Sequence, residues 1–416
     1  GTPHTPTPGG APLSVRSTEY YLKRLGVLTA LTWTGGAHEV NGGIWYETND
    51  FTQARRFYGE PSITGPTHDF TELQSNAFQT DWEYDFDTES YVFHLQDTWS
   101  VTDKLRLNFG FRSVHAENTA KTVAAINATL VKNGTIEADE PFLPQVGFNW
   151  SIADDMEWFG SAARNVRPFA SSGTSGPFST TAAGFEAIRD VLEPETANNF
   201  ETGLRLRGAA FEALVAVYHV DFKDRLVGIN TGPGILGNPS VLANVGSVTT
   251  NGAEAALTWR PLQSLTWFTS LAWNDSEYDD NYTTINAQGV TRLVQVKGKQ
   301  VTDTPEILLK SELTYDNGAF FASANVNYTD ERFYTYLNRG SVDAYTLVNL
   351  AAGYRFRGLG AFEQLSIQLD ATNVTDKEYF STIDSNGFTE TDPNGTFQSL
   401  LLGAPRQFFL SAKAKF

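Results

Sequence analysis

The chain has 416 residues, a net charge of −18 and no cysteine, and its 29 Phe, 16 Tyr and 9 Trp bring the aromatic fraction to 13%. That much aromatic surface excludes an intrinsically disordered chain, and the lack of cysteine excludes disulfide scaffolds, cysteine-ligated metal centres and thiol catalysis. The acidic balance argues against nucleic acid as a partner, and the longest apolar runs, about eight residues, are too short for a transmembrane helix.

Apolar and polar residues alternate with a period of two in segments separated by turn residues, which is typical of strands with one apolar face. In one segment, Leu105, Leu107 and Phe109 alternate with Arg106 and Asn108. The pattern predicts about fifteen strands. They cover residues 17–34, 38–57, 88–101, 104–116, 142–152, 155–166, 196–207, 210–229, 247–260, 265–279, 305–315, 319–334, 343–357, 361–378 and 404–416.

Short and long connections alternate along the whole chain. The short ones are residues 35–37, 102–103, 153–154, 208–209, 261–264, 316–318 and 358–360. The long ones are residues 58–87, 117–141, 167–195, 230–246, 280–304, 335–342 and 379–403. Outer-membrane barrels sort their connections in this way, with short periplasmic turns and long extracellular loops. The sequence therefore predicts an all-β fold, a transmembrane antiparallel β-barrel.

Aromatic residues near the predicted strand ends, such as Trp33, Trp99 and Trp150, fit the girdles at a membrane interface. The same residues would also pack in a water-soluble β core, so a sandwich or a propeller stays an alternative. Bacterial barrels have an even number of strands, and plugged transporters have 22. An odd count therefore predicts that residues 1–416 are the later part of a longer barrel, with residues 1–16 in an outer loop.

Several motifs resemble those of TonB-dependent outer-membrane receptors, in the order in which that family has them. They are residues 91–105, the segment Arg164–Phe169, residues 192–203, residues 244–254, the segment Ala371–Tyr379 and the ending from Gly403 to Phe416. The resemblance covers nearly the whole chain. Each motif alone is weakly specific, and the six in order carry the resemblance.

The resemblance implies a receptor in the outer membrane of a Gram-negative bacterium that imports a scarce ligand, a ferric siderophore or another iron chelate. It implies TonB as a partner through a segment that is not in this chain, an N-terminal plug domain that is also not in this chain, and contacts with outer-membrane lipid and lipopolysaccharide. No cofactor is expected. The alternatives are a passive porin-like channel, and a receptor for a non-iron ligand such as an oligosaccharide or cobalamin.

An enzyme is not expected. The chain has six histidines, none of them spaced as a metal pair, and no Gly-x-Ser-x-Gly motif. His219 and Asp221 share a strand face, and we interpret them as polar groups of the lumen. Acidic stretches at residues 81–89, 137–140 and 275–280 are interpreted as solvated outer-loop surface.

Ligand contacts are expected where arginine and aromatic residues meet on outer loops. Aromatic rings offer flat, rigid contact area, and arginine can bind carboxylate or phosphate groups with two hydrogen bonds. The predicted ligand-binding residues are Arg167, Phe169, Arg332, Tyr334, Tyr336 and Arg339.

Overall fold

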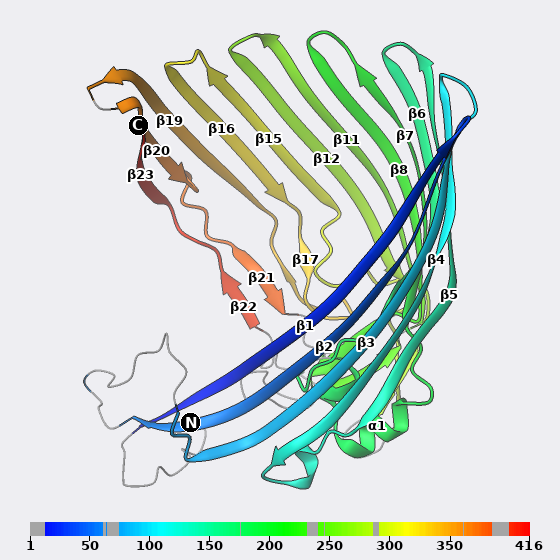
Figure 1. The fold of residues 1–416 in the computed structure, drawn as a ribbon. Coiled ribbons are helices and arrows are strands. Elements are labelled where there is room, and N and C mark those ends of the chain that lie inside the picture. Colours follow the sequence, from blue (N-terminus) through cyan, green and yellow to red (C-terminus); the bar gives the residue numbers. More distant parts are fainter. Residues whose placement is uncertain are drawn as a thin grey trace.

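The computed structural model describes residues 13–60, 64, 75–174, 176–230, 240–244, 246–285, 291–360, 362–384 and 399–416. Within these residues, one antiparallel sheet of fifteen strands forms a long, strongly curved wall (Figure 1). Its strands are β1 (Leu13–Gly35), β2 (His38–Glu60), β3 (Gln79–Ser100), β4 (Leu105–Ala125), β5 (Gly134–Ala153), β6 (Met156–Arg167), β7 (Glu195–Arg207), β8 (Phe211–Lys223), β11 (Val248–Leu262), β12 (Leu265–Tyr278), β15 (Ile307–Asp316), β16 (Phe320–Thr329), β19 (Tyr345–Leu359), β20 (Phe362–Thr372) and β23 (Gln407–Lys415).

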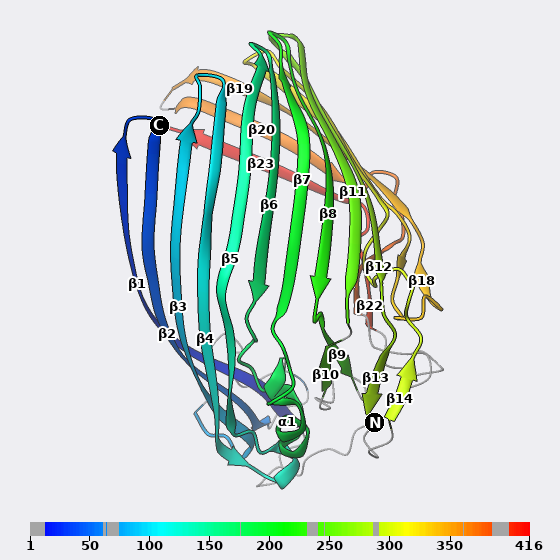
Figure 2. The same cartoon turned by 90° about the vertical axis from the view of Figure 1, so that its right-hand side faces the viewer.

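Each strand of this sheet pairs with the sheet strands that precede and follow it in the chain. The wall therefore runs in sequence order from β1 to β23, and among the described residues these two end strands have a partner on one side only. Tight turns gather at one end of the wall, the turn end, and the long connections at the other, the loop end (Figures 1 and 2). The predicted fifteen strands and their antiparallel arrangement are confirmed.

The predicted boundaries at the loop end are wrong for three strands. β3 begins at Gln79, β4 continues to Ala125 and β5 begins at Gly134, so much of the predicted loops 58–87 and 117–141 is strand. The physical reason lies in an aromatic run. Trp82, Tyr84 and Phe86 alternate with acidic residues and are buried, which requires an extended strand whose one face is covered.

Three other predicted strands end early. β8 stops at Lys223, before Asp224 with φ 54°, and β20 stops at Thr372, before Asn373 with φ 48°. Such left-handed backbone interrupts a pleated strand. β16 also stops early, at Thr329. The loop end carries four separate pairs: β9 (Leu226–Asn230) with β10 (Ser240–Asn244), β13 (Tyr282–Ile285) with β14 (Thr291–Val294), β17 (Arg332–Phe333) with β18 (Ser341–Val342), and β21 (Phe380–Asp384) with β22 (Ser399–Leu402).

Helical structure in the described residues is limited to η2 (Ala128–Leu130), η3 (Pro177–Ser179) and α1 (Ala182–Ile188), all at the loop end. None of the helices described is long and apolar enough to cross a membrane. The buried side chains form two clusters, also at the loop end. One lies on β3–β5 with residues 169–192, and the other joins β11–β14 to residues 296–337.

Candidate functional site

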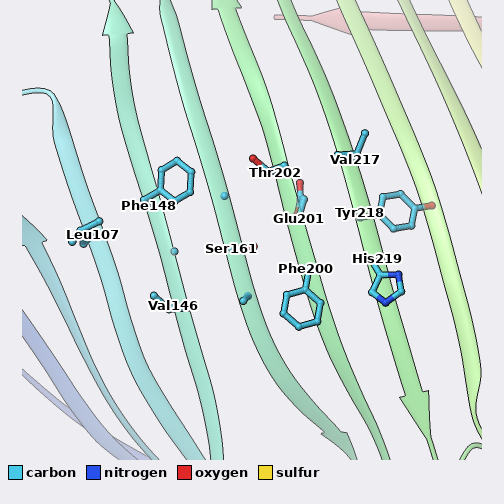
Figure 3. A pocket seen from close by; sticks show the side chains of 13 residues that line it. Leu107, Val146, Phe148, Ser161, Phe200, Glu201, Thr202, Val217, Tyr218 and His219 are labelled. Atoms are coloured by element: carbon cyan, nitrogen blue, oxygen red, sulfur yellow. The ribbon is translucent and has the colours of Figure 1, made fainter.

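The wall has one apolar face. In the cross-strand register, Phe200 lies opposite Ala162 on β6 and Leu204 lies opposite Val215 on β8, and residues in direct register share a face. A shallow groove of about 550 Å³ on this part of the wall is lined by Val146, Phe148, Phe200 and Val217 among others (Figure 3). Phe200 and Val217 are exposed there.

His219 belongs to the apolar face, and the interpretation of His219 and Asp221 as lumen groups is wrong. His219 lies in register with Phe200, and its Nε2 lies 2.9 Å from Asp221 Oδ1. Its Nδ1 lies 2.8 Å from Asn251 Oδ1. Val215 and Val217 lie on the same face of β8 as His219. This face therefore carries apolar side chains in the middle of the strand and polar side chains near its end.

The opposite face is polar over the same length. The charged side chains that the register places on this face include Arg106, Arg112, Glu201, Arg205, Arg207, Glu254, Lys310, Glu312, Arg355, Asp370, Lys413 and Lys415. Neighbouring groups bond across strands. Arg205 donates to Glu157 Oε1 at 2.6 Å, Arg112 donates to Asn165 Oδ1 at 2.6 Å, and the Gln145 amide donates to Gln96 at 2.9 Å. A polar groove of about 570 Å³ lies on this face between β3 and β7.

At the loop end, the polar face gives way to an aromatic surface that is covered by a folded connection. Trp82, Tyr84 and Phe86 of β3 lie in one cluster with Phe169, Phe178 and Phe185 of the connection between β6 and β7. The Phe86 and Phe178 rings are 5.7 Å apart, and the Phe178 and Phe185 rings stack at 4.9 Å. Residues 169–192, named the docked segment here, therefore fold back onto the wall.

Hydrogen bonds with side chains of β2 and β4 hold the docked segment against the wall. The Gly173 N–H donates to Gln53 Oε1 at 2.9 Å, and the Asn118 amide donates to the Phe169 carbonyl at 3.2 Å. Gln53 and Asn118 are both buried. A Cβ at position 173 would lie 2.6 Å from the Tyr84 ring, so only glycine allows this close approach. Burial of Tyr84 raises the pKa of its hydroxyl, which donates to the Leu130 carbonyl at 2.7 Å.

A lysine is buried beneath the docked segment. Lys132 Nζ donates to the carbonyl of Thr180, just before α1. Its described surroundings provide no carboxylate within ion-pair distance. Burial lowers the pKa of Lys132 to about 8, well below the value for a lysine in water.

Tyr336 belongs to the second cluster, and Arg332 lies four residues before it in the chain. Arg332 is buried, with one nitrogen 3.0 Å from Asp303 Oδ1 and another donating to the Phe380 carbonyl at 2.7 Å. The Tyr336 ring meets that of Tyr278 edge-on at 6.2 Å. These contacts tie β17 and its hairpin to the connections after β12 and β20.

The six predicted ligand-binding residues are not gathered at one point: Phe169 belongs to the first buried cluster and Tyr336 to the second. Arg167, Tyr334 and Arg339 are accessible to solvent, whereas Phe169, Arg332 and Tyr336 are buried in the contacts given above. Arg167 lies 3.9 Å from Glu195. A role in ligand binding stays a prediction for all six. Among the described residues, no group of three or more His, Asp or Glu side chains is placed to hold a metal ion.

Sequence reasoning missed the aromatic surface of β2–β4, because it placed residues 58–87 in a loop. The signal was present in the alternation of Trp82, Tyr84 and Phe86 with Glu83 and Asp85.

Comparison with known proteins decides the family. The family model for the TonB-dependent receptor-like β-barrel matches residues 2–374. The chain belongs to this family. It is an outer-membrane protein of a Gram-negative bacterium, so the apolar face contacts lipid and the polar face lines the lumen. The turn end is periplasmic and the loop end is extracellular.

Solved structures show the same fold at low sequence identity. The ferric citrate transporter FecA in its unliganded form has a TM-score of 0.72 at 16% identity, over 97% of this chain and 55% of its own. The siderophore receptor PiuA from Acinetobacter baumannii has a TM-score of 0.69 at 18% identity, over 96% of this chain and 56% of its own. The ferric yersiniabactin uptake receptor FyuA from Yersinia pestis has a TM-score of 0.66 at 15% identity, over 97% and 55%.

The chain thus spans a little over half the length of these receptors. No curated protein sequence matches it significantly.

Proposed function

We propose that this receptor chain takes part in TonB-coupled uptake of a scarce ligand, a ferric siderophore or another iron chelate. The family match is the observation that carries the proposal. The similar structures include a ferric citrate transporter, a ferric yersiniabactin uptake receptor and a siderophore receptor. The copper transporter OprC, at a TM-score of 0.66, shows that the fold also serves another metal.

The described residues support a binding role. The docked segment and the hairpins of the second cluster narrow the extracellular mouth with surfaces that carry aromatic rings and arginines. Below them, the lumen wall holds polar groups that bond to one another, such as Arg205 with Glu157. A ligand would bind among the extracellular segments, where Arg167, Tyr334 and Arg339 are accessible, and would exchange polar contacts with the wall during passage. The reaction is transport and makes no covalent bond.

The proposal extends to parts outside the chain. We propose that residues 1–416 form the later part of a longer receptor barrel, that a plug domain elsewhere in the protein gates the lumen, and that TonB engages a segment outside this chain. The coverage of about 55% of FecA supports this arrangement. Lipopolysaccharide is the proposed partner of the apolar face at its extracellular edge.

The test is uptake of radioactive iron by cells that carry or lack the complete gene. We expect uptake from some ferric chelates to require the gene, a proton gradient and TonB. Uptake that persists without TonB and without energy would instead show a passive channel. Gene-dependent uptake of cobalamin or an oligosaccharide, with no effect on iron, would reassign the ligand.

A further inference from the structure

Two arginines lie close together on the lumen face at the extracellular mouth. Thr18 of β1 lies in register with Arg55 of β2, and Arg16 lies in register with Phe57. Arg16 and Arg55 are therefore diagonal neighbours on one face, and such positions are about 7–8 Å apart. Like charges on neighbouring side chains repel unless a counter-charge lies nearby.

Neither arginine has a carboxylate within ion-pair distance among the residues described. The Arg55 guanidinium lies over the Trp82 ring at 5.1 Å, and its buried Nε has no hydrogen-bond acceptor. Burial, and then the charge of Arg16, lower the pKa of Arg55. The negative charge of Asp81 opposes this lowering of the Arg55 pKa. Asp81 Oδ1 itself accepts a hydrogen bond from the Gln79 amide at 2.5 Å.

The other two arginines of β1 and β2 have carboxylate partners. Arg56 is the next residue and points to the opposite face, where it bonds to Glu19 and lies 2.8 Å from Glu83. Arg24, deeper on the lumen face, lies 2.6 Å from Glu47. Of the four arginines on these two strands, only Arg16 and Arg55 lack an ion pair among the described residues.

Aromatic rings flank the pair. Tyr20, 61% exposed, stacks on Phe51 at 5.8 Å, and Trp82 stacks on Tyr84 at 4.8 Å. The lumen wall thus presents two guanidinium groups beside flat, rigid rings. Guanidinium groups bind carboxylate oxygens with two parallel hydrogen bonds, and a surface that is partly shielded from water strengthens that attraction.

We propose that Arg16 and Arg55, with Tyr20 beside them, form a subsite that binds a net negatively charged iron chelate through its carboxylate-type oxygens. This inference rests on the proposed function and names the charge class of its ligand. The subsite lies on strands of the wall, outside the six residues predicted from the loops.

The experiment measures binding of three classes of ferric chelate to the purified full-length receptor: ferric citrate and other anionic chelates, neutral chelates, and the cationic ferrioxamine B. The variants are Arg16→Gln, Arg55→Gln and Arg55→Lys. The control is Arg260→Gln, which makes the same charge change on the exposed arginine that lies 3.4 Å from Glu212 at the turn end. Heat-modifiable migration in gels shows that each variant is folded.

We expect the receptor to bind an anionic chelate, with affinity reduced about tenfold or more in each Gln variant. We expect Arg55→Lys to retain part of the affinity, Arg260→Gln to leave it unchanged, and added salt to weaken binding. Anionic binding that is unaffected by the Gln variants would overturn the subsite. Binding of neutral or cationic chelates alone would also overturn the subsite, although the proposed function in iron uptake would remain valid. Binding of no ferric chelate would overturn the proposed iron ligand and the subsite with it.

Discussion

Lys132 shows how one residue can couple the docked segment to pH. Its folded pKa, about 8, lies below the value of about 10.4 for a solvated lysine. The undocked state therefore binds more protons between these values, and docking becomes more favourable as pH rises from about 8 to 10.5. The cost of burying Lys132 in its charged form, which is removed when the group loses its proton, corresponds to about 3 kcal/mol.

We predict that raising the pH from 7 to 10 increases the docked population in the natural chain and that Lys132→Met removes this dependence. Since the chain has no cysteine, a spin label on Glu186→Cys, exposed on α1, can report the mobile fraction. A mobile fraction that does not change with pH in the natural chain would contradict the prediction.

Among elements, β3, β4 and β5 place like charges in register. Glu117 lies directly opposite Glu89 on one side and Glu137 on the other. Opposed like charges destabilise a sheet, by about 0.2–1 kcal/mol per pair.

We predict that Glu117→Gln stabilises the barrel by about this amount and that the gain shrinks in high salt. Lys121→Gln is the matched control, because Lys121 lies opposite Asp85 and its loss should destabilise. The measurement is the midpoint of urea unfolding in detergent. A Glu117→Gln variant that is less stable than the natural protein would refute the repulsion.

The docked segment depends on its buried phenylalanines. Phe178 is 1% exposed, and truncation of a buried phenylalanine to alanine costs about 3–5 kcal/mol. We predict that Phe178→Ala releases residues 169–192 to proteolysis while the strands remain folded. Val191→Ala, at a side chain that is 69% exposed, should leave the cleavage rate unchanged. Equal rates for the two variants would show that Phe178 does not hold the segment.

At the scale of the whole molecule, the two end strands of the sheet each leave one edge of backbone N–H and C=O groups without a strand partner among the described residues. β1 has 23 residues, and its outer edge has no strand partner among the described residues, as is true of β23. In the hydrocarbon core of a membrane, each unpaired backbone group costs several kcal/mol.

We therefore predict that the 416-residue chain produced alone does not give a heat-modifiable monomer in detergent, whereas the product of the complete reading frame does. Gel mobility before and after boiling is the measurement. A heat-modifiable monomer of the 416-residue chain would show that β1 and β23 can pair directly.

Period-two patterning was sufficient to predict the fifteen strands, since lipid on one side and a polar lumen on the other impose it on every strand. The same pattern did not predict the part of the strands that extends beyond the membrane. There the aromatic residues of β3 are buried by Phe178 and Phe185, which lie about a hundred residues later in the chain. Likewise, the alternation on β8 predicted a lumen position for His219, and only the register with Phe200 reversed it.

The sequence alone determined the class of fold, the antiparallel order and the family, because these follow from local alternation, connection length and motif order. The tertiary structure decided which connections fold inward, which predicted ligand residues are buried, and that Arg16 and Arg55 face the lumen together. Those features depend on contacts between residues that are distant in the chain, and no local pattern records such contacts.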